Sequence, residues 1–268
     1  MKNIIIICKK DITVIKKKNI IKKWIKDNYP DKNIYSEANY KLEINLDLII
    51  CIGGDGTLLY ANKFLSQNKT IPFFLVGSGT LEFIPNNNYD NFKNNLRKIF
   101  NNNFNTLELT KISIDSFNYQ AINEISIHRS NSSKILTLEI YVDNFLITNF
   151  RGDGLIVSTP IGSTAYNLSA GGSLIAPNNS VFIITPICPF SLSFRPLIIS
   201  DDSIINIKII KSDTSVQIEG DGNFISNLNK GDNIIIKKDN NKINLLYSDK
   251  ININNWFLNL TKKLNWGN

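Results

Sequence analysis

The segment of the chain best suited to chemistry is Gly53-Gly54-Asp55-Gly56-Thr57, which combines three glycines with one carboxylate. An apolar run at 46–52 precedes it, and a stretch with helical spacing of apolar residues follows it. Glycines let the backbone approach a ligand closely, and backbone amides at a strand-to-helix turn bind phosphate. A carboxylate beside phosphate is unfavourable by charge, unless it holds a metal ion or accepts a hydroxyl proton during phosphoryl transfer. We therefore predict a phosphate-binding loop in which Asp55 is the reactive group.

Residues 151–169, followed by Ala170-Gly171-Gly172, form a second unusual segment. The chain is dominated by 46 Ile, 40 Asn and 26 Lys, whereas Gly, Ala, Arg and Pro together number only 32. Fifteen of those 32 residues lie within 151–196, and no lysine occurs between Lys134 and Lys208. A segment rich in small residues and hydroxyls can place hydroxyl groups and backbone amides around a polar ligand. This segment is the second candidate binding site.

The first of these segments requires a sheet that presents loops at one edge. Apolar runs at 4–8, 46–52 and 71–76 do not alternate with polar residues, and stretches with helical spacing separate them. Such strands are typical of a parallel sheet that helices cover on both faces. We predict an α/β N-terminal domain with a mainly parallel sheet over residues 1–104.

The second segment lies in a region with a different pattern. From residue 107 the apolar residues recur with a period of two, and turn residues separate short runs, which favours an all-β, sandwich-like C-terminal domain over residues 105–249. The later strands expected there are 145–149, 154–159, 181–185, 203–210, 214–219, 233–238 and 242–247. Trp256, Phe257, Leu260 and Leu264 predict a C-terminal helix over 250–268, and we expect it to pack back on the N-terminal domain.

The charge distribution argues against a nucleic-acid partner, and we expect none. The net charge is +7, but residues 1–41 hold 11 lysines and four acidic residues, whereas residues 42–268 hold 19 basic and 19 acidic residues. The basic stretch has helical spacing with its apolar residues on one face, so we interpret the lysines as a solvated helix surface.

The remaining composition points to a cytoplasmic protein. No apolar run approaches the ~18 residues that span a bilayer, and no signal-peptide pattern is present. The three cysteines form no Cys-x-x-Cys pair, which fits a reducing compartment. One histidine, His128, leaves almost no material for a multi-histidine metal site or a Ser-His-Asp triad. We expect no membrane partner.

Several motifs together resemble one enzyme family. Gly53-Gly54-Asp55-Gly56-Thr57 after a strand resembles the donor loop shared by NAD kinases, diacylglycerol kinases and sphingosine kinases, and a close variant occurs in 6-phosphofructokinases. Residues 151–169 are similar to the most specific motif of the NAD kinases, which the lipid kinases lack. Asn123-Glu124 and residues 185–196 resemble two further motifs of the family. The motifs occur in family order, and the resemblance to NAD kinases covers essentially the whole chain.

The resemblance implies an activity and a donor site. NAD kinases transfer the γ-phosphoryl group of a nucleoside triphosphate to the 2′-hydroxyl of the adenosine ribose of NAD. Asp55 would then be the general base, and ATP and NAD would be the substrates. The donor phosphates would lie on Gly53, Gly54, Gly56 and Thr57, with Mg²⁺ or another divalent cation neutralising charge. The resemblance also implies a homo-oligomer, either a dimer or a tetramer, in which a second subunit completes the site.

The resemblance implies a dinucleotide site as well. Its substrate-binding residues would be Asp55, Gly56, Asn123, Glu124, Lys134, Arg151, Asp153, Thr164, Ala165, Tyr166, Asn167, Leu168, Ser169 and Asn223. Asn123 and Glu124 would hold ribose hydroxyls or the adenine edge. Asp153 would accept a hydrogen bond from the nicotinamide carboxamide, and Tyr166 would supply an aromatic face at the adenine end.

Three features differ from the family pattern. Phe190 stands where the family usually has His, and Asn223 stands where Gln is common. Gly77, Ser78 and Glu82 replace the usual Asn, Arg and Gly of the loop after the third apolar run. Two alternatives remain open at this point: a lipid kinase of the same superfamily, and a non-catalytic dinucleotide-binding protein.

Overall fold

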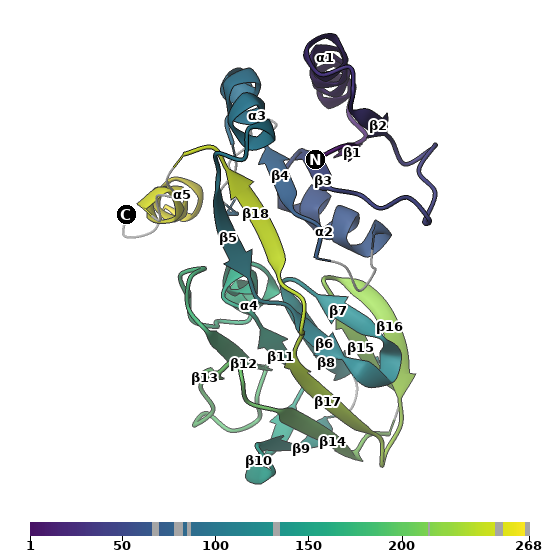
Figure 1. Cartoon of the computed structure of the whole chain (residues 1–268). Helices are drawn as coiled ribbons and strands as arrows, with labels where there is room; N and C mark the ends of the chain where they lie inside the picture. The colour runs from purple at the N-terminus through teal and green to yellow at the C-terminus, as the bar shows by residue number, and fades with distance from the viewer. Residues whose placement is uncertain are drawn as a thin grey trace. The chain divides into compact units, whose positions relative to one another are not determined.

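A computed structural model describes the chain in two compact units (Figure 1). The described residues are 1–268 without 66–69, 78–82, 85–86, 131–134, 214, 250–253 and 266–268, and without the side chains of 254 and 255. Unit 1 comprises Met1–Glu108 and Ile243–Asn268, and unit 2 comprises Leu109–Lys242.

Unit 1 is built on a six-stranded sheet with the order β2-β1-β3-β4-β18-β5. Its strands are β1 Asn3–Cys8, β2 Asn33–Tyr35, β3 Leu48–Ile52, β4 Phe73–Val76, β5 Asn105–Leu109 and β18 Ile243–Tyr247. Its helices are α1 Ile12–Asn28, α2 Asp55–Phe64, α3 Phe92–Phe100, preceded by a 3₁₀ turn at Tyr89–Asn91, and α5 Asn254–Leu264. The pairs β1–β2, β1–β3, β3–β4 and β4–β18 are all parallel, which confirms the mainly parallel α/β architecture.

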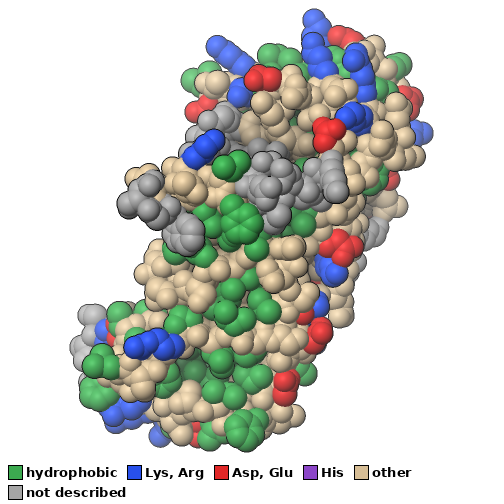
Figure 2. Space-filling view, turned by 90° about the vertical axis from the view of Figure 1, so that its left-hand side faces the viewer, with side chains coloured by type: hydrophobic (Ala, Val, Ile, Leu, Met, Phe, Trp, Pro, Cys, Tyr) green, Lys and Arg blue, Asp and Glu red, His purple; other side chains and the backbone are tan. Residues whose placement is uncertain are grey.

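The basic N-terminal helix packs as its spacing predicts. The Asp11 side chain caps α1 by accepting hydrogen bonds from the N–H groups of Thr13 and Val14, which satisfies donors that a helix start leaves free. One face of α1 is buried in the core of unit 1 through Val14, Ile21, Trp24 and Ile25. Other apolar residues of α1, Ile12, Ile15 and Ile20, are exposed, and its lysines are exposed or half-exposed. Figure 2 shows several of the Lys and Arg side chains projecting from the surface.

Unit 2 consists of two six-stranded sheets, β10-β9-β14-β17-β6-β7 and β13-β12-β11-β8-β15-β16. The strands of the first are β6 Ile112–Ile114, β7 Tyr119–Ala121, β9 Leu136–Val142, β10 Phe145–Gly152, β14 Ile205–Lys211 and β17 Asn233–Lys238. Those of the second are β8 Glu124–Arg129, β11 Gly154–Ser158, β12 Val181–Ile187, β13 Leu197–Ser200, β15 Val216–Gly220 and β16 Asn223–Leu228. A 3₁₀ turn at Asp115–Phe117 precedes β7. One buried cluster combines residues from both sheets, so the sheets pack face to face, as the alternating pattern predicts.

The structure differs from the sequence expectations in a few elements. Residues 242–247 were expected among the strands of the all-β domain, but β18 pairs with β4 in the sheet of unit 1, with Leu245 opposite Phe73. Leu245, Leu246 and Tyr247 are consecutive buried residues, which suits a strand covered on both faces and not a half-exposed one. The pattern also gave no sign of the edge strands β2, β13 and β16. Among the described helices, none is both long and apolar enough to cross a membrane.

Candidate functional site

The donor loop of unit 1 lies where β3 ends and α2 begins. Gly53 has φ +151°, and a Cβ there would collide with the Thr57 side chain, so only glycine fits this turn. At Gly56, by contrast, nothing lies within 4 Å of a built Cβ. Packing therefore explains Gly53, whereas Gly56 leaves open space above the start of α2, where helical N–H groups favour an anion.

Asp55 is the first residue of α2 and is tied to the loop after β4. Its two carboxylate oxygens accept hydrogen bonds from the N–H groups of Phe83, at 3.1 Å, and Ile84, at 3.2 Å. Burial raises the pKa of Asp55, while these two hydrogen bonds and the Lys263 ammonium oppose the rise. A raised pKa moves a carboxylate towards the pH at which a general base works best. The Lys263 ammonium, on α5, lies 3.8 Å from the centre of the Phe83 ring.

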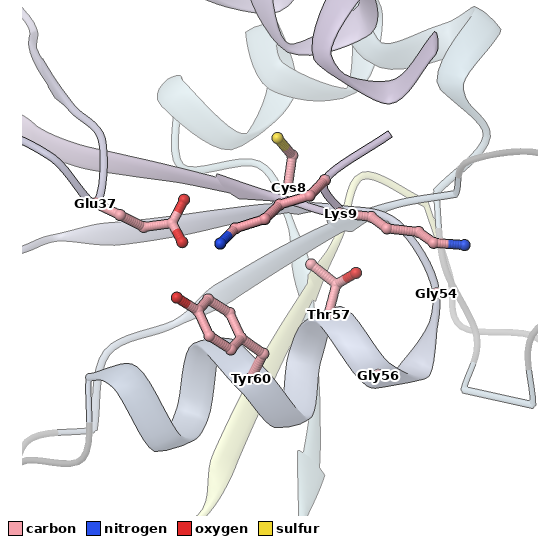
Figure 3. A pocket seen from close by; sticks show the side chains of 8 residues that line it. Cys8, Lys9, Glu37, Gly54, Gly56, Thr57 and Tyr60 are labelled. Carbon is pink, nitrogen blue, oxygen red and sulfur yellow. The ribbon is translucent and has the colours of Figure 1, made fainter. Parts of the chain in front are cut away.

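A pocket of about 480 Å³ opens beside the donor loop (Figure 3). Its lining residues come from three segments that end or begin at one edge of the sheet: Cys8, Lys9 and Lys10 after β1, Glu37 after β2, and Gly54, Gly56, Thr57 and Tyr60 at α2. In the register of the sheet Cys8 lies opposite Ile52, so the carboxyl ends of β1 and β3 are neighbours. Four of these residues were not predicted from the sequence as site residues: Lys9, Lys10, Glu37 and Tyr60. The signal that could have found the lysines is their position directly after a buried parallel strand, since ligands bind at that edge.

In unit 2 the Asn123-Glu124 segment is clamped from two sides. The Asp221 carboxylate accepts hydrogen bonds from the N–H groups of Ile122 at 2.9 Å, Asn123 at 2.7 Å and Glu124 at 3.3 Å. From the other side the N–H of Thr159 donates to the Asn123 carbonyl at 2.9 Å. These bonds fix the backbone of the segment, so the Asn123 and Glu124 side chains project from a rigid support.

Asp221 was missed as a site residue. With φ +48° it forms, together with Gly222 at φ +69°, the two-residue turn between β15 and β16. An Asp-Gly pair between alternating runs is a strong hairpin signal, which predicts the turn but not its contact with a segment almost 100 residues earlier. Asn223, a predicted substrate contact, donates from its amide to the Asp221 carbonyl at 3.0 Å and therefore also supports this turn.

Glu124 is the most unusual titratable group of unit 2. It is 6% exposed, and its Oε2 atom has no hydrogen-bond partner among the described residues. Burial, followed by the Asp221 carboxylate, raises its pKa to about 7, while a hydrogen bond from the Tyr166 backbone opposes the rise. A buried acceptor without a partner is costly, and a ligand hydroxyl would satisfy it.

The corner after β11 supports this segment through small residues and hydroxyls. It contains a 3₁₀ turn at Ile161–Thr164 and the short helix α4 at Tyr166–Ser169. A Cβ at Gly162 would collide with the Asn123 carbonyl, so the corner can lie against the clamped segment only with glycine there. The Thr159 hydroxyl donates to the Ile122 carbonyl at 2.7 Å.

The residues predicted on this corner have different surroundings. Asn167 is fully buried and bonds to Ser163, Ser173 and Thr185, so its amide holds the corner together. The Thr164 hydroxyl donates to the Ile161 carbonyl at 3.1 Å. Thr164, Ala165 and Leu168 are half-buried, whereas Tyr166 and Ser169 are exposed. Burial raises the pKa of Tyr166, and the charges of Glu219, Cys188, Glu124 and Asp153 add to the rise.

Arg151 and Asp153 lie at the junction of β10 and β11. The exposed Arg151 guanidinium lies 4.9 Å from the centre of the Phe190 ring, so Phe190 supports Arg151 by a cation–π contact where a histidine was expected. The Asp153 carboxylate forms an ion pair with Arg129 at 2.8 Å. Three positions singled out from the sequence lie outside the described residues: Ser78, Glu82 and Lys134.

Comparison with known proteins identifies the family. The model of the ATP-NAD kinase N-terminal domain matches residues 7–104, and that of the ATP-NAD kinase C-terminal domain matches residues 122–248. An NAD kinase of Lachnoclostridium phytofermentans is 37% identical over 215 residues, which cover 75% of each chain. The yeast NADH kinase, in complex with NADH, matches the structure with a TM-score of 0.88 at 26% identity, covering 100% of this chain and 88% of that chain.

One relative is much longer than this chain. The bifunctional NADP phosphatase/NAD kinase of Methanococcus maripaludis is 35% identical over 251 residues, which cover 87% of this chain but 43% of that protein. The chain therefore spans less than half the length of this relative. The similarities favour neither the lipid kinase nor the non-catalytic alternative. Two domain models that together cover most of the sequence, and a relative matched over three quarters of its length, show that the chain belongs to the NAD kinase family.

Proposed function

We propose that this protein transfers the γ-phosphoryl group of ATP to the 2′-hydroxyl of the adenosine ribose of NAD, giving NADP and ADP. The observation that carries the proposal is the buried Glu124 carboxylate, whose Oε2 atom has no partner among the described residues while its backbone is held rigidly by Asp221. A carboxylate oxygen accepts hydrogen bonds only, so it calls for a ligand with hydroxyl or amino donors. The ribose hydroxyls and adenine amino group of NAD supply such donors.

Unit 1 would supply the phosphoryl-transfer chemistry. The 2′-oxygen of the ribose attacks the γ-phosphorus, the bond from that phosphorus to the β,γ-bridging oxygen breaks, and ADP leaves. Asp55 accepts the proton of the 2′-hydroxyl as the new bond forms. The raised pKa of Asp55 suits this role, because a base with a pKa nearer neutrality binds the proton more firmly. Gly54, Gly56 and Thr57 at the start of α2 hold the donor phosphates.

Unit 2 would orient the dinucleotide. Asn123 and Glu124 bind ribose hydroxyls or the adenine edge, and the exposed Tyr166 ring offers an aromatic face. The corner residues Thr164 and Ala165, with Leu168 and Ser169, complete the adenine end. Arg151 and Asp153 interact with the nicotinamide half. In this assignment Asn167 and Asn223 act as positioning residues, since their amides bond to neighbouring protein groups.

A divalent cation fits the donor loop as a companion of the phosphates. Among the described residues, no three His, Cys, Asp or Glu side chains gather as they would in an all-protein metal cage. Mg²⁺ usually takes one or two carboxylates and otherwise phosphate oxygens and water, and the donor loop offers one carboxylate, that of Asp55. When bound, the ion would neutralise charge on the transferring phosphoryl group.

The proposal includes a homo-oligomer, a dimer or tetramer, that works in the cytoplasm. Support for association comes from unit 2, where Phe145 is 72% exposed and Leu192 is 88% exposed. In Figure 2 hydrophobic side chains cover much of the lower part of the surface shown. Large apolar patches on a soluble protein mark association surfaces. The three cysteines Cys8, Cys51 and Cys188 are all free, which suits a reducing compartment.

The decisive assay measures NADP formed from NAD, ATP and Mg²⁺ by the purified chain, with NADH as a second acceptor. Asp55→Asn should lower kcat by at least ~100-fold, the usual contribution of a general base. Asp47→Asn is the matched control, because the Asp47 carboxylate also accepts two backbone hydrogen bonds, from Lys2 and Asn3, away from the donor loop. Absence of NADP with folded wild-type protein would refute the activity, and an active Asp55→Asn variant would refute the base.

A further inference from the structure

The pocket beside the donor loop is larger than a phosphate site requires. Its volume of about 480 Å³ lies within the ~300–1,000 Å³ typical of small-molecule sites. In the sheet order β2-β1-β3-β4, the strand that follows β1 in the chain lies on one side of β1, and the next strand, β3, lies on its other side. Ligands of such parallel sheets bind outside the carboxyl ends of the strands where the strand order reverses in this way. The pocket lies at such a position, because its lining residues come from the ends of β1 and β2 and from the start of α2.

The two ends of the pocket differ in charge. Lys9 and Lys10 are exposed and line the pocket. In Figure 3 one lysine side chain extends towards Gly54 and the α2 N-terminus, where it adds to the attraction for phosphate, and the other extends towards Glu37. Figure 3 shows Glu37 and Tyr60 at the opposite end from Gly54, with Cys8 and Thr57 between them. A ligand that fills the pocket therefore meets the helix N-terminus and one ammonium group at one end, and the Glu37 carboxylate with a second ammonium group near it at the other.

Glu37 and Tyr60 are held in place by their own neighbours. The Tyr60 hydroxyl donates a hydrogen bond to the Glu37 carboxylate, and this bond is the main cause of a raised pKa at Tyr60. The Tyr60 ring stacks on Phe64 with 6.1 Å between ring centres. The turn that carries Glu37 is fixed by Asn39, whose side-chain oxygen accepts from the N–H of Ser36 at 2.6 Å. One tyrosine hydroxyl leaves further lone pairs of the carboxylate for a ligand.

We propose, building on the proposed phosphotransferase function, that this pocket binds the phosphoryl donor as a nucleoside triphosphate and that Glu37 selects it over inorganic polyphosphate. The triphosphate lies at the α2 N-terminus and at the lysine that extends towards it, and the ribose hydroxyls donate to Glu37. A nucleoside is uncharged and offers hydroxyl donors, whereas a polyphosphate chain of the same length brings further negative charge against the carboxylate. Glu37 therefore acts as an attractive contact for one donor and a repulsive one for the other.

The test compares donors across a matched pair of variants. NADP formation is measured with ATP, 2′-deoxy-ATP, 3′-deoxy-ATP and tripolyphosphate, each as its magnesium complex, for wild type, Glu37→Gln and Glu43→Gln. Glu43 is an exposed carboxylate of the same unit outside the pocket, so Glu43→Gln controls for the loss of one charge.

We expect Glu37→Gln to raise the KM for ATP about tenfold or more, the factor of one hydrogen bond to a charged group, with little change in kcat. Its KM for tripolyphosphate should stay constant or fall. Wild type should lose about tenfold in kcat/KM with at least one deoxy nucleotide, and Glu37→Gln should lose much less. The proposal is overturned if wild type uses tripolyphosphate as well as ATP, or if Glu37→Gln changes the KM values for ATP and tripolyphosphate by the same factor.

Calorimetric titration separates this proposal from the activity on which it rests. The same three proteins are titrated with a non-hydrolysable ATP analogue and with tripolyphosphate, so no turnover is needed. Selective weakening of the nucleotide by Glu37→Gln supports the donor assignment even if no NADP forms. Equal binding of both ligands by wild type and Glu37→Gln overturns it even if the protein makes NADP.

Discussion

Glu124 should make the stability of unit 2 depend on pH. Burial, and then the Asp221 carboxylate, raises its pKa in the folded protein from an ordinary value of 4.5 to about 7. Between these two values the folded chain keeps the proton and the unfolded chain releases it. Because the unfolded state binds fewer protons there, the free energy of unfolding falls as pH rises through this window and levels off above it.

The size of the effect follows from the separation of the two pKa values. A difference of one pKa unit corresponds to about 1.4 kcal/mol. The free energy of unfolding should therefore change by about 3 kcal/mol in total between roughly pH 4 and pH 8. That is a large share of the ~5–15 kcal/mol that stabilises a typical domain. With a urea dependence of about 1–3 kcal/mol per molar, the unfolding midpoint should fall by roughly 1–3 M across the window.

The assay is urea unfolding of wild type and Glu124→Gln at several pH values, without ligand. Far-ultraviolet circular dichroism is the suitable signal, because all three tryptophans belong to the sequence ranges of unit 1 and would not report unit 2. The difference between the two proteins isolates Glu124, since other titrating groups, Asp221 included, are present in both. Glu139→Gln, which removes a half-buried carboxylate of β9, gives the general effect of such a substitution.

A difference between wild type and Glu124→Gln that stays constant from pH 4 to pH 8 would refute this reasoning.

The same group links pH to NAD binding. Ribose hydroxyls donating to the Oε2 atom stabilise the charged carboxylate, so bound NAD should lower the pKa of Glu124. Wild type should then release protons on binding NAD near pH 6, which calorimetry in buffers of different ionisation enthalpy measures.

Other substitutions test the supports of the two sites. Asp221→Asn keeps a residue that tolerates the left-handed turn, but it places an amide NH₂ group against the Ile122 N–H, where a carboxylate oxygen accepted its hydrogen bond. The substitution should lower the free energy of unfolding in urea by about 1.5–3 kcal/mol and raise the KM for NAD. Gly56→Ala should leave stability unchanged or raise it by up to about 1 kcal/mol, because alanine favours a helix more than glycine and nothing lies near the new methyl group. The same substitution should lower kcat/KM for ATP. A loss of stability would contradict this reasoning. Asp11→Ala removes the cap of α1 and should cost about 1 kcal/mol without changing the KM for either substrate, as thermal unfolding and initial rates would show.

The parts of the site that are contiguous in the sequence could be predicted, and the parts that the fold assembles could not. Gly53–Thr57 carries its turn, its helix start and its carboxylate within five residues, so its chemistry can be read locally. Lys9 and Glu37 join this loop only because β2, β1 and β3 are parallel neighbours whose carboxyl ends meet. Strand order is a tertiary property that the apolar pattern does not encode.

The same distinction applies in unit 2. The turn at Asp221-Gly222 can be predicted from local turn chemistry, but the three hydrogen bonds of Asp221 to residues 122–124 require β15 to pair with β8. The burial of Glu124 likewise depends on strands that pair on both sides of β8. β18 shows the converse, because its apolar run was recognised as a strand but its sheet is decided by which buried edge accepts it, here that of β4.

The glycines of the two predicted segments have different physical causes. In residues 151–172 a Cβ at Gly152, Gly154, Gly162 or Gly172 would collide with atoms of the protein itself. Their small size is therefore required by the close packing of the corner on the strands, and no ligand is needed to explain it. Gly56 has no such neighbour, and a helical position without steric need would be more stable with alanine. Packing does not explain Gly56, whereas the proposed contact with donor phosphates would, so Gly56→Ala tests that contact more directly than a substitution in the glycine-rich segment of unit 2 does.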